Sequence, residues 1–468
     1  MKTPLTKRVL EPSGLPVYHA EVDAPVTHVQ VWTPFGSDRL NYRDAQTGRE
    51  VRLQPGSAHY FEHLLFNENP LKYDKSLKAR LAYHGINMAR TVLGNKRSDA
   101  LRIPKRRIGS GMSVLKANRA TEVNAFTFYD TTNYWFLGNK RVLENTGILT
   151  SMVLDLHLPE WRFKEEAGAV VEEEKAKQDI LFTVLVNRWH AQAFHETHGA
   201  HFPVIGTPET IVRTSYSDVV SLFKTFYTPS QMTVVVTGRV DIDQVCEVIT
   251  QQLERLGRNI YQTPPQEIAQ QDQYGVREAD NFGNPIQRAD IKRPMVFFGW
   301  KRAVDPTELS LEENIRLQLA SRIAGTGLFG EGTMQREELI AQGIDDRTFG
   351  ADTLETREHA LVYGHVDTED PQKTREIIQG AASKLRSDGL SQNEFDYARN
   401  VILLAVDTAN MARIASNLGK WAVTTGDPAS YHRFIDLLEN VKPGDIQDCF
   451  DQVLNPDNFS MVLAEPKK

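Results

Sequence analysis

Apolar and polar positions follow the same order at two distant places in the chain. In the first half, a stretch with helical spacing at 217–223 is followed by Pro229 and then by the apolar run Met232–Val236. The corresponding places in the second half are taken by 444–450, Pro456 and Phe459–Leu463. Both copies have five residues from Asp to Phe and six from Phe to Pro. Each copy predicts a short helix, a turn and a buried strand, and the pair indicates an internal duplication.

A polar segment separates the two copies. Residues 261–289 are poor in apolar side chains and contain two consecutive prolines, which is typical of a linker. We predict one domain at 1–260 and a homologous domain at 290–468. The first copy is the longer, and we place much of the excess in a basic segment at about 95–119, with eight Lys and Arg residues against one Asp. A solvated surface insertion is the favoured interpretation, and a loop that guides a substrate or partner is the alternative.

Composition narrows the class of protein. The 468 residues are 40% hydrophobic and 25% charged, with a formal net charge of −7, so we expect a globular protein and no nucleic-acid binding. No apolar run approaches the roughly 18 residues of a membrane helix, and no signal peptide is recognised, so we expect no membrane segment and a cytoplasmic location. Cys246 and Cys449 are far apart, so a bound metal would need histidine and carboxylate ligands.

His59, Glu62 and His63 form the pattern H-x-x-E-H. Two histidines four positions apart project from one face of a helix, so both imidazoles can reach the same metal ion. The glutamate lies beside the first histidine, where it can hold a metal-bound water and take its proton. This reversed form of the zincin motif is the inverzincin signature. Because the pattern fixes only three positions, its context decides whether it marks a metal site.

The context includes a glutamate-rich segment downstream. Zinc hydrolases use three protein ligands and keep one position open for water, so a third ligand is required. Residues 165–175 predict a helix, and Glu166 and Glu173 are seven positions apart, which places them on one face. Most glutamates of such a helix lie on a solvated face. A metal ligand among them requires that the helix packs against 59–63.

Several motifs, in order along nearly the whole chain, resemble those of the M16 metallopeptidases, the family of pitrilysin, insulin-degrading enzyme and mitochondrial processing peptidase. They are His59–Phe66, Asn124–Thr127, Asp130–Tyr134, the glutamate helix, His201–Glu209 and Tyr227–Pro229. The resemblance implies an α+β fold with two homologous domains, each a mostly antiparallel sheet with helices packed on one face. It also implies one catalytic site, in the first domain.

The resemblance assigns roles to the acidic residues. It implies that Glu173 completes a site for one Zn²⁺ per chain with the two histidines, and that Glu166 supports this site from the same helix face. Glu172 is the alternative ligand, because the acidic run allows a slip of one residue. Glu62 is expected to act as the general base of a zinc metalloendopeptidase.

The resemblance also predicts how a substrate binds. In the family an extended peptide pairs with a strand edge, here the strand that contains Asn124, Ala125 and Phe126. The alternative for Phe126 is a place in the core. Arg336 is a candidate substrate-binding residue of the second domain, whereas Asp346 occupies the position of an expected tyrosine. The expected substrates are unfolded peptides, and the expected assembly is a homodimer or a heterodimer with a related chain.

Other interpretations remain open. The chain is either self-sufficient, or a zinc-bearing subunit whose partner supplies the missing tyrosine, or a non-catalytic assembly subunit, against which the intact motif argues. Four histidines, His190, His195, His198 and His201, contain no pair at helical i, i+4 spacing, and no second zinc site is expected from them. The stretch Gly325–Gly330 is not a phosphate loop, because no Lys-Ser/Thr follows it. It resembles the glycine-rich, substrate-handling loop of the family's second repeat.

Overall fold

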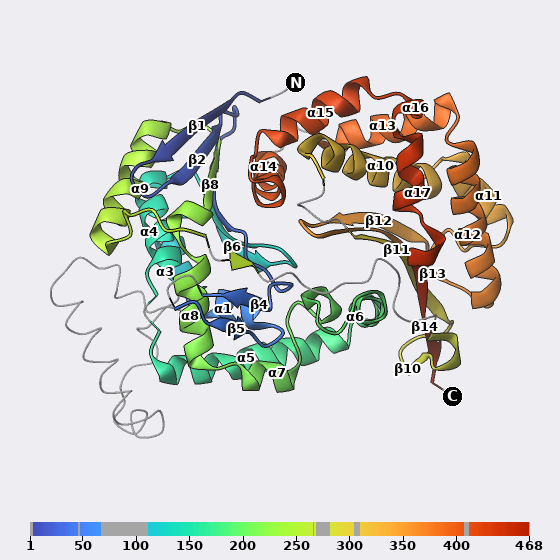
Figure 1. The fold of residues 1–468 in the computed structure, drawn as a ribbon, viewed down its shortest axis with the longest axis horizontal. Coiled ribbons are helices and arrows are strands. Elements are labelled where there is room, and N and C mark those ends of the chain that lie inside the picture. Colours follow the sequence, from blue (N-terminus) through green and yellow to red (C-terminus); the bar gives the residue numbers. More distant parts are fainter. Residues whose placement is uncertain are drawn as a thin grey trace. The chain divides into compact units, whose positions relative to one another are not determined.

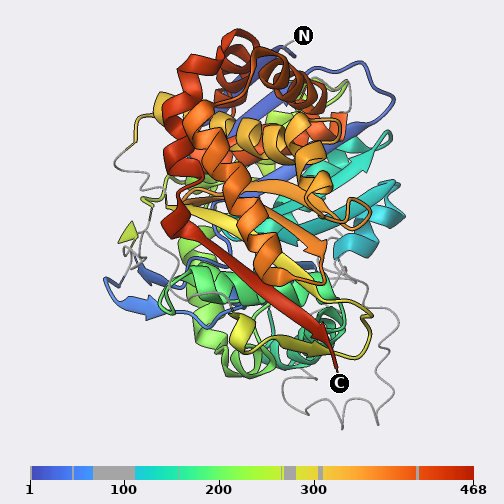
Figure 2. The ribbon, with the colours of Figure 1, turned by 90° about the vertical axis from the view of Figure 1, so that its right-hand side faces the viewer.

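The computed structural model describes residues 3–44, 47–66, 111–156, 158–264, 266–267, 281–303, 309–406 and 411–467. Much of the predicted basic segment and of the predicted linker lies outside these ranges. The described residues combine helices with three sheets, which confirms the α+β class (Figures 1 and 2). None of the described helices is long and apolar enough to cross a membrane.

The chain divides into two compact units. Unit 1 comprises Met1–Ala176, Pro203–Ala269 and Ala409–Pro428, and unit 2 comprises Lys177–Phe202, Gln270–Thr408 and Ala429–Lys468. Two segments therefore cross the predicted division at 261–289. Residues 177–202 belong with the second unit, and 409–428 belong with the first.

Unit 1 contains a six-stranded sheet in the order β1-β2-β8-β3-β7-β6. Neighbouring strands are antiparallel except β2 and β8, which run parallel. A small sheet of order β5-β4-β9 completes the unit. The strands are β1 (Leu5–Leu10), β2 (Leu15–Ala20), β3 (Thr27–Thr33), β4 (Asn41–Arg43), β5 (Glu50–Arg52), β6 (Glu122–Thr127), β7 (Thr132–Gly138), β8 (Thr233–Thr237) and β9 (Gln266–Glu267).

Unit 2 repeats this arrangement in a five-stranded sheet of order β10-β14-β11-β13-β12. Again one pair, β10 and β14, is parallel and the others are antiparallel. The strands are β10 (Ile286–Arg288), β11 (Met295–Ala303), β12 (Gly350–Glu355), β13 (His359–Asp367) and β14 (Phe459–Pro466). Both predicted buried strands, β8 and β14, follow a short 3₁₀ helix that begins at Pro229 or Pro456. The predicted duplication is confirmed by this shared strand order.

The described helices are distributed between the two units. Unit 1 contains α1 (Ser57–Phe66), α3 (Gly111–Ala117), α4 (Val142–Leu154), α5 (Glu160–Gln178), α7 (Pro208–Arg213), α8 (Tyr216–Phe226), α9 (Ile242–Leu256) and α14 (Met411–Thr425). Unit 2 contains α6 (Leu181–Ala193), α10 (Leu311–Phe329), α11 (Met334–Ala341), α12 (Pro371–Asp388), α13 (Gln392–Val406), α15 (Ser430–Asn440), α16 (Pro443–Ile446) and α17 (Phe450–Val453).

Each sheet has a helix from the other repeat on one of its faces. In unit 2, Trp189 of α6 packs on Phe297 with ring centroids 5.9 Å apart, whereas the next residue, Phe298, packs on Phe329 of α10 at 5.7 Å. Successive residues of a strand point to opposite faces, so α6 and α10 cover opposite faces of this sheet. The sheet is thus covered on both faces. Helices on one face were predicted, and α6 covers the other face in addition.

The reciprocal helix, α14, covers the sheet of unit 1. It packs beside β3 and β8 (Figure 1), and a Cβ at its Gly419 would overlap the indole of Trp32. The neighbouring Val31 points to the other face, into the core cluster that includes side chains of α1 and α4. The exchange of α6 and α14 explains why two segments cross the predicted domain division.

The glycine-rich loop predicted at 325–330 is helical over most of its length. Gly325–Phe329 forms the end of α10, and its glycines permit close packing: a Cβ would lie 3.0 Å from Thr353 at Gly325 and 2.8 Å from Leu390 at Gly327. The prediction of a glycine-rich loop here was wrong for this reason. Gly111 and Met112 of the basic segment begin α3, whose place before β6 matches that of α11 before β12.

Candidate metal centre

Helix α1 is buried on most of its surface. Tyr60, Phe61, Leu64 and Leu65 have no exposed area and anchor it in the core of unit 1. Gly56, directly before the helix, has φ +87°, and a Cβ there would collide with the carbonyl of Ile205. Glycine is the residue that tolerates both conditions. The start of α1 is thereby fixed, and His59, Glu62 and His63 lie on this helix as their spacing predicts.

Helix α5 packs against α1, as a metal ligand among its glutamates requires. Phe163 and Val170 are buried, and the ring of Phe163 lies 5.2 Å from that of Tyr60. The Tyr60 hydroxyl donates a hydrogen bond to the Phe163 carbonyl. These contacts hold the two helices side by side, so that the face bearing Glu166 and Glu173 meets the histidines.

Three side chains converge with metal-ligand geometry. His59 Nε2 lies 3.8 Å from Glu173 Oε1, and His63 Nε2 lies 3.1 Å from Glu173 Oε2. One ligand atom from each residue falls within 4.8 Å of the other two. Tetrahedral zinc with bonds of about 2.1 Å places neighbouring ligand atoms about 3.4 Å apart, so this set fits the ion. Within the described ranges no other group of three or more His, Cys, Asp or Glu side chains meets this condition.

Glu166 supports His63 from the side away from this set. Its Oε1 accepts a hydrogen bond from His63 Nδ1 at 3.0 Å. Burial lowers the pKa of His63, but its hydrogen bonds to Glu166 and Glu173 and the charge of Glu62 outweigh burial and raise the pKa to about 9. A carboxylate on Nδ1 fixes the tautomer that leaves Nε2 available to a metal.

Glu172 points away from the histidines. Its carboxylate pairs with Lys175 at 2.8 Å, and its side chain is 74% exposed. Glu172, the alternative ligand considered from the sequence, therefore lies on the solvated face of α5. Glu173 contacts the histidines.

The side chain of Glu62 lies between its own helix, α1, and the sheet. Its side chain is buried, and the Thr127 hydroxyl donates a hydrogen bond to its Oε2 at 2.7 Å. Thr127 ends β6, the edge strand of the six-stranded sheet. This contact was not predicted from the sequence, although Thr127 lies in the motif Asn124–Thr127, two positions after Ala125, and so shares its strand face.

The three proposed substrate residues lie on β6. Asn124 is exposed, Ala125 is half-buried, and Phe126 is 40% exposed with its ring edge-on to Trp32 at 5.6 Å. The alternative that Phe126 is a core residue was wrong, because this side chain stays at the surface of the sheet. In the part of the chain that the structure describes, no strand pairs with the outer edge of β6.

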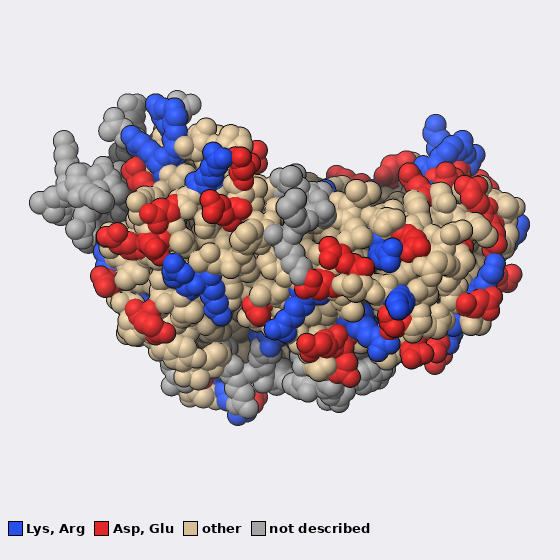
Figure 3. Space-filling model, turned by 90° about the horizontal axis from the view of Figure 1, so that it is seen from above, with Lys and Arg blue, Asp and Glu red and all other residues tan. Residues whose placement is uncertain are grey.

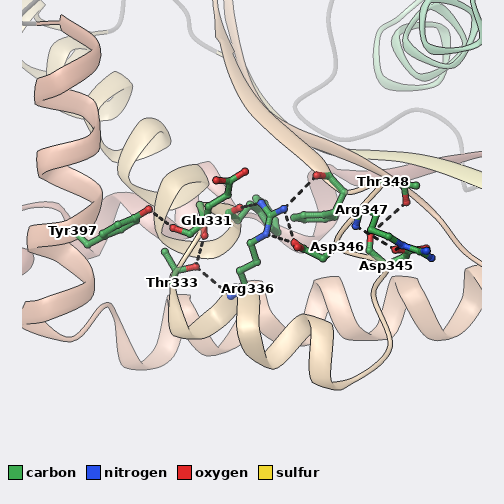
Figure 4. Close-up of polar contacts among 11 residues, drawn as sticks. Glu331, Thr333, Arg336, Asp345, Asp346, Arg347, Thr348 and Tyr397 are labelled. Atoms are coloured by element: carbon green, nitrogen blue, oxygen red, sulfur yellow. Dashed lines mark hydrogen bonds and ion pairs between the residues drawn. The ribbon is translucent and has the colours of Figure 1, made fainter.

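Arg336 lies in unit 2, whereas the other candidate residues lie in unit 1. Its guanidinium donates to Asp346 Oδ1 and to the Phe329 carbonyl, both at 2.7 Å, and stacks over Phe349 (Figure 4). Arg336 is only 8% exposed. Asp346, at the expected tyrosine position, is thus the ion-pair partner of Arg336, and together they fix the turn between α11 and β12.

Unit 2 contains no counterpart of the motif at the equivalent place. Helix α10 occupies the position of α1 and contains no histidine. Its Arg322 forms a two-point ion pair with Glu355 at the end of β12, with distances of 3.2 and 2.8 Å. Glu355 is buried, so an internal ion pair fills this region of unit 2.

The histidines near residue 200 help to hold a turn in unit 2. His190 and His198 both stack on Phe194, with ring centroids 5.4 and 5.0 Å away, and His359 approaches the same ring. His190 Nδ1 bonds to the Ala200 carbonyl at 3.0 Å. Burial lowers the pKa of His190 to about 3 and that of His359 well below its usual value, so both rings are neutral and serve packing.

Basic and acidic side chains are intermixed on one face of the described residues. On the face shown in Figure 3, Lys and Arg alternate with Asp and Glu without a continuous region of one sign. This mixed surface accompanies the net charge of −7.

Comparisons with known proteins connect these features. Residues 213–402 match a family model described as the Peptidase M16 inactive domain, a range that excludes the candidate metal ligands. YmfH of Bacillus subtilis (strain 168), named as an uncharacterized zinc protease, is 23% identical over 367 residues, 75% of this chain and 80% of that protein. The mitochondrial-processing peptidase subunit beta of Blastocladiella emersonii is 23% identical over 250 residues, 53% of this chain and 44% of that protein.

A solved structure extends the likeness over the whole chain. The crystal structure of an M16-like peptidase from Alicyclobacillus acidocaldarius superposes with a TM-score of 0.80 and covers 100% of both chains at 20% identity. The duplicated fold, the order of the motifs and the related proteins agree. In sequence and in fold, the chain is similar to M16 peptidases.

Proposed function

We propose that this protein is a zinc-dependent endopeptidase that hydrolyses unfolded peptides. The observation that supports this most directly is the convergence of His59, His63 and Glu173, with Glu62 buried beside them. When bound, zinc lowers the pKa of a water molecule from about 15.7 towards 7 and polarises a peptide carbonyl. The relatives named as zinc proteases support the same assignment.

The protein residues divide the remaining tasks. His59, His63 and Glu173 hold the ion, and Glu166 keeps His63 in the tautomer that binds through Nε2. Glu62 takes the proton of the attacking water and passes it to the leaving amine. Its burial keeps the carboxylate close to the ligands and away from bulk solvent.

The substrate binds as an added strand on β6. An extended peptide forms main-chain hydrogen bonds with the outer edge of this strand, beside Asn124, Ala125 and Phe126. A folded protein does not present a free extended segment of this kind. The proposed preference for unfolded peptides follows from this geometry.

A second candidate function is that of a zinc-bearing subunit. Asp346 replaces the expected tyrosine and is bound to Arg336, so unit 2 offers neither side chain as a free substrate contact. A related chain would then supply these contacts, and one relative is named as a subunit of a peptidase. We propose a dimer in either case, and the cytoplasmic location stays a prediction.

Removal and return of the metal test the proposal. The purified protein is treated with a chelator, dialysed and incubated with unstructured peptides, with mass spectrometry of the products. We expect no cleavage without metal and full recovery with one equivalent of zinc per chain. Cleavage that persists without metal would contradict the proposal. Recovery only after a second, related chain is added would favour the subunit function.

A further inference from the structure

We propose that Thr127 is a positioning residue for the general base Glu62, which links the base to the strand that receives the substrate. The inference rests on the proposed function and adds a residue to which neither the motif nor the comparisons assign a role. Thr127 Oγ1 lies 2.7 Å from Glu62 Oε2, a short distance for a hydroxyl that donates to a carboxylate.

The strand geometry directs Thr127 toward α1. Val123 belongs to the core cluster and Ala125 packs against it, so alternate residues of β6 point to the face on which α1 lies. Thr127 continues this series. Phe126 points to the opposite face, where it contacts Trp32. The hydroxyl of Thr127 is therefore presented to Glu62 by the backbone of β6, without any need for a flexible side chain.

The Thr127 hydroxyl has two possible partners, Glu62 and Thr132, and it donates its proton to Glu62. Thr127 pairs with Thr132 of β7 across the hairpin, and their hydroxyl oxygens are 3.4 Å apart. A threonine hydroxyl has one proton to donate. Thr132 donates its own proton to the Phe35 carbonyl at 2.9 Å. The Thr127 proton goes to Glu62, because the carboxylate is the stronger acceptor and, at 2.7 Å against 3.4 Å, the nearer one. Thr132 has no exposed area, which keeps this end of the hairpin rigid.

A pair of neutral tyrosines lies near the base. Tyr134 and Tyr227 are fully buried, with their hydroxyl oxygens 3.0 Å apart. Burial and the nearby charge of Glu62 raise the pKa of both phenols. Glu62 thus lies near uncharged phenols, and Thr127 donates to its carboxylate from the edge strand β6.

The consequence concerns turnover. A peptide that pairs with β6 is positioned by this strand. The hydrogen bond from Thr127 positions the Glu62 carboxylate against the same strand. The distance from the base to the scissile carbonyl is then set by one rigid strand, and a displacement of about 1 Å at such a point costs about 100-fold in rate. The Thr127 hydroxyl should therefore affect kcat more than KM.

The test compares three substitutions in the full-length, zinc-loaded protein. T127V removes the hydroxyl and keeps the shape, T127S keeps the hydroxyl, and T121V removes the hydroxyl of Thr121, which bonds to the Leu137 carbonyl next to the other end of β6. Steady-state kinetics use the peptide that wild type cleaves fastest. Zinc content, zinc affinity and thermal unfolding are measured for each variant, and T127A replaces T127V if the latter does not fold.

We expect T127V to lose about 10- to 100-fold in kcat, within the contribution of a general base, with KM within about twofold and zinc affinity unchanged. T127S should retain most of kcat, and T121V should equal wild type. Equal kcat for T127V and wild type would overturn the inference, as would a loss confined to KM or to zinc affinity. A zinc-bound wild type that cleaves nothing would instead contradict the proposed function, and the role of Thr127 with it.

Discussion

At the residue scale, the candidate centre depends on which atoms a helix face presents. Spacing alone predicts that His59 and His63 share a face, because a helix repeats every 3.6 residues. The choice of Glu173 over Glu172 came from resemblance. In the structure Glu173 contacts His63, whereas Glu172 pairs with Lys175. Thr127 was missed because its contact joins residues 65 positions apart, a distance that no local pattern encodes.

The two adjacent glutamates provide a matched pair of variants. E173A should weaken zinc binding by at least about 100-fold, because it removes a ligand, which costs more than the 10- to 100-fold of a supporting residue. E172A should leave zinc affinity within about twofold, since Glu172 pairs with Lys175. Competition with a chromophoric chelator measures both. Equal losses for the two variants would contradict the assignment.

At the element scale, the pattern along the chain predicts elements but not their partners. The apolar face of α14 predicts a buried helix, yet nothing in that pattern tells which sheet it covers. The exchange of α6 and α14 depends on contacts such as Gly419 with Trp32 and Trp189 with Phe297, which form only in the fold. The glycines of α10 were misread because glycine also serves close helix packing.

Substitution of helical glycines tests the packing of α14. G419A places a methyl group against the indole of Trp32 and should destabilise the protein by about 1–3 kcal/mol, the cost of overpacking. The control is G380A in α12, where a Cβ meets no neighbour within 4 Å. It should stabilise by about 0.5–1 kcal/mol. Urea unfolding measures both, and two stabilising substitutions would exclude the described contact.

The histidine turn of unit 2 predicts acid lability. The pKa of His190 is about 3 in the fold and 6.5 for an unperturbed imidazole, so the unfolded state binds more protons between these values. Stability is therefore lost as the pH falls below about 6.5, by at most about 1.4 kcal/mol per pH unit for each such histidine. Urea unfolding followed by tryptophan fluorescence should show this slope. H190N, which cannot titrate, should flatten it, and an unchanged slope would refute the assignment.

At the scale of the whole molecule, two copies of one fold have diverged in chemistry. Both sheets share the order of their strands, yet α1 bears the three motif side chains while the Arg322–Glu355 ion pair fills the matching region of unit 2. The duplication could be predicted from the repeated spacing before Pro229 and Pro456. The exchange of helices could not, and it gives each unit a segment encoded in the other half of the chain.

Cutting the chain within 261–289 tests this exchange. The fragment that ends before the cut lacks α14, and the fragment that begins after it lacks α6, so each alone leaves an apolar sheet face uncovered. We expect either fragment to aggregate when expressed alone and the two to copurify when expressed together. Two separately soluble, monomeric and folded fragments would contradict the exchange.

The most direct test of the central claim is cleavage by wild type and E62Q, compared side by side. Both proteins are loaded with zinc, their metal content is measured, and each is incubated with the same mixture of unstructured peptides before mass spectrometry. We predict one zinc per chain in both, cleavage by wild type, and a loss of at least about 100-fold in E62Q. Equal cleavage by both would show that Glu62 is not the base, and a zinc-bound wild type that cleaves nothing would contradict a self-sufficient peptidase.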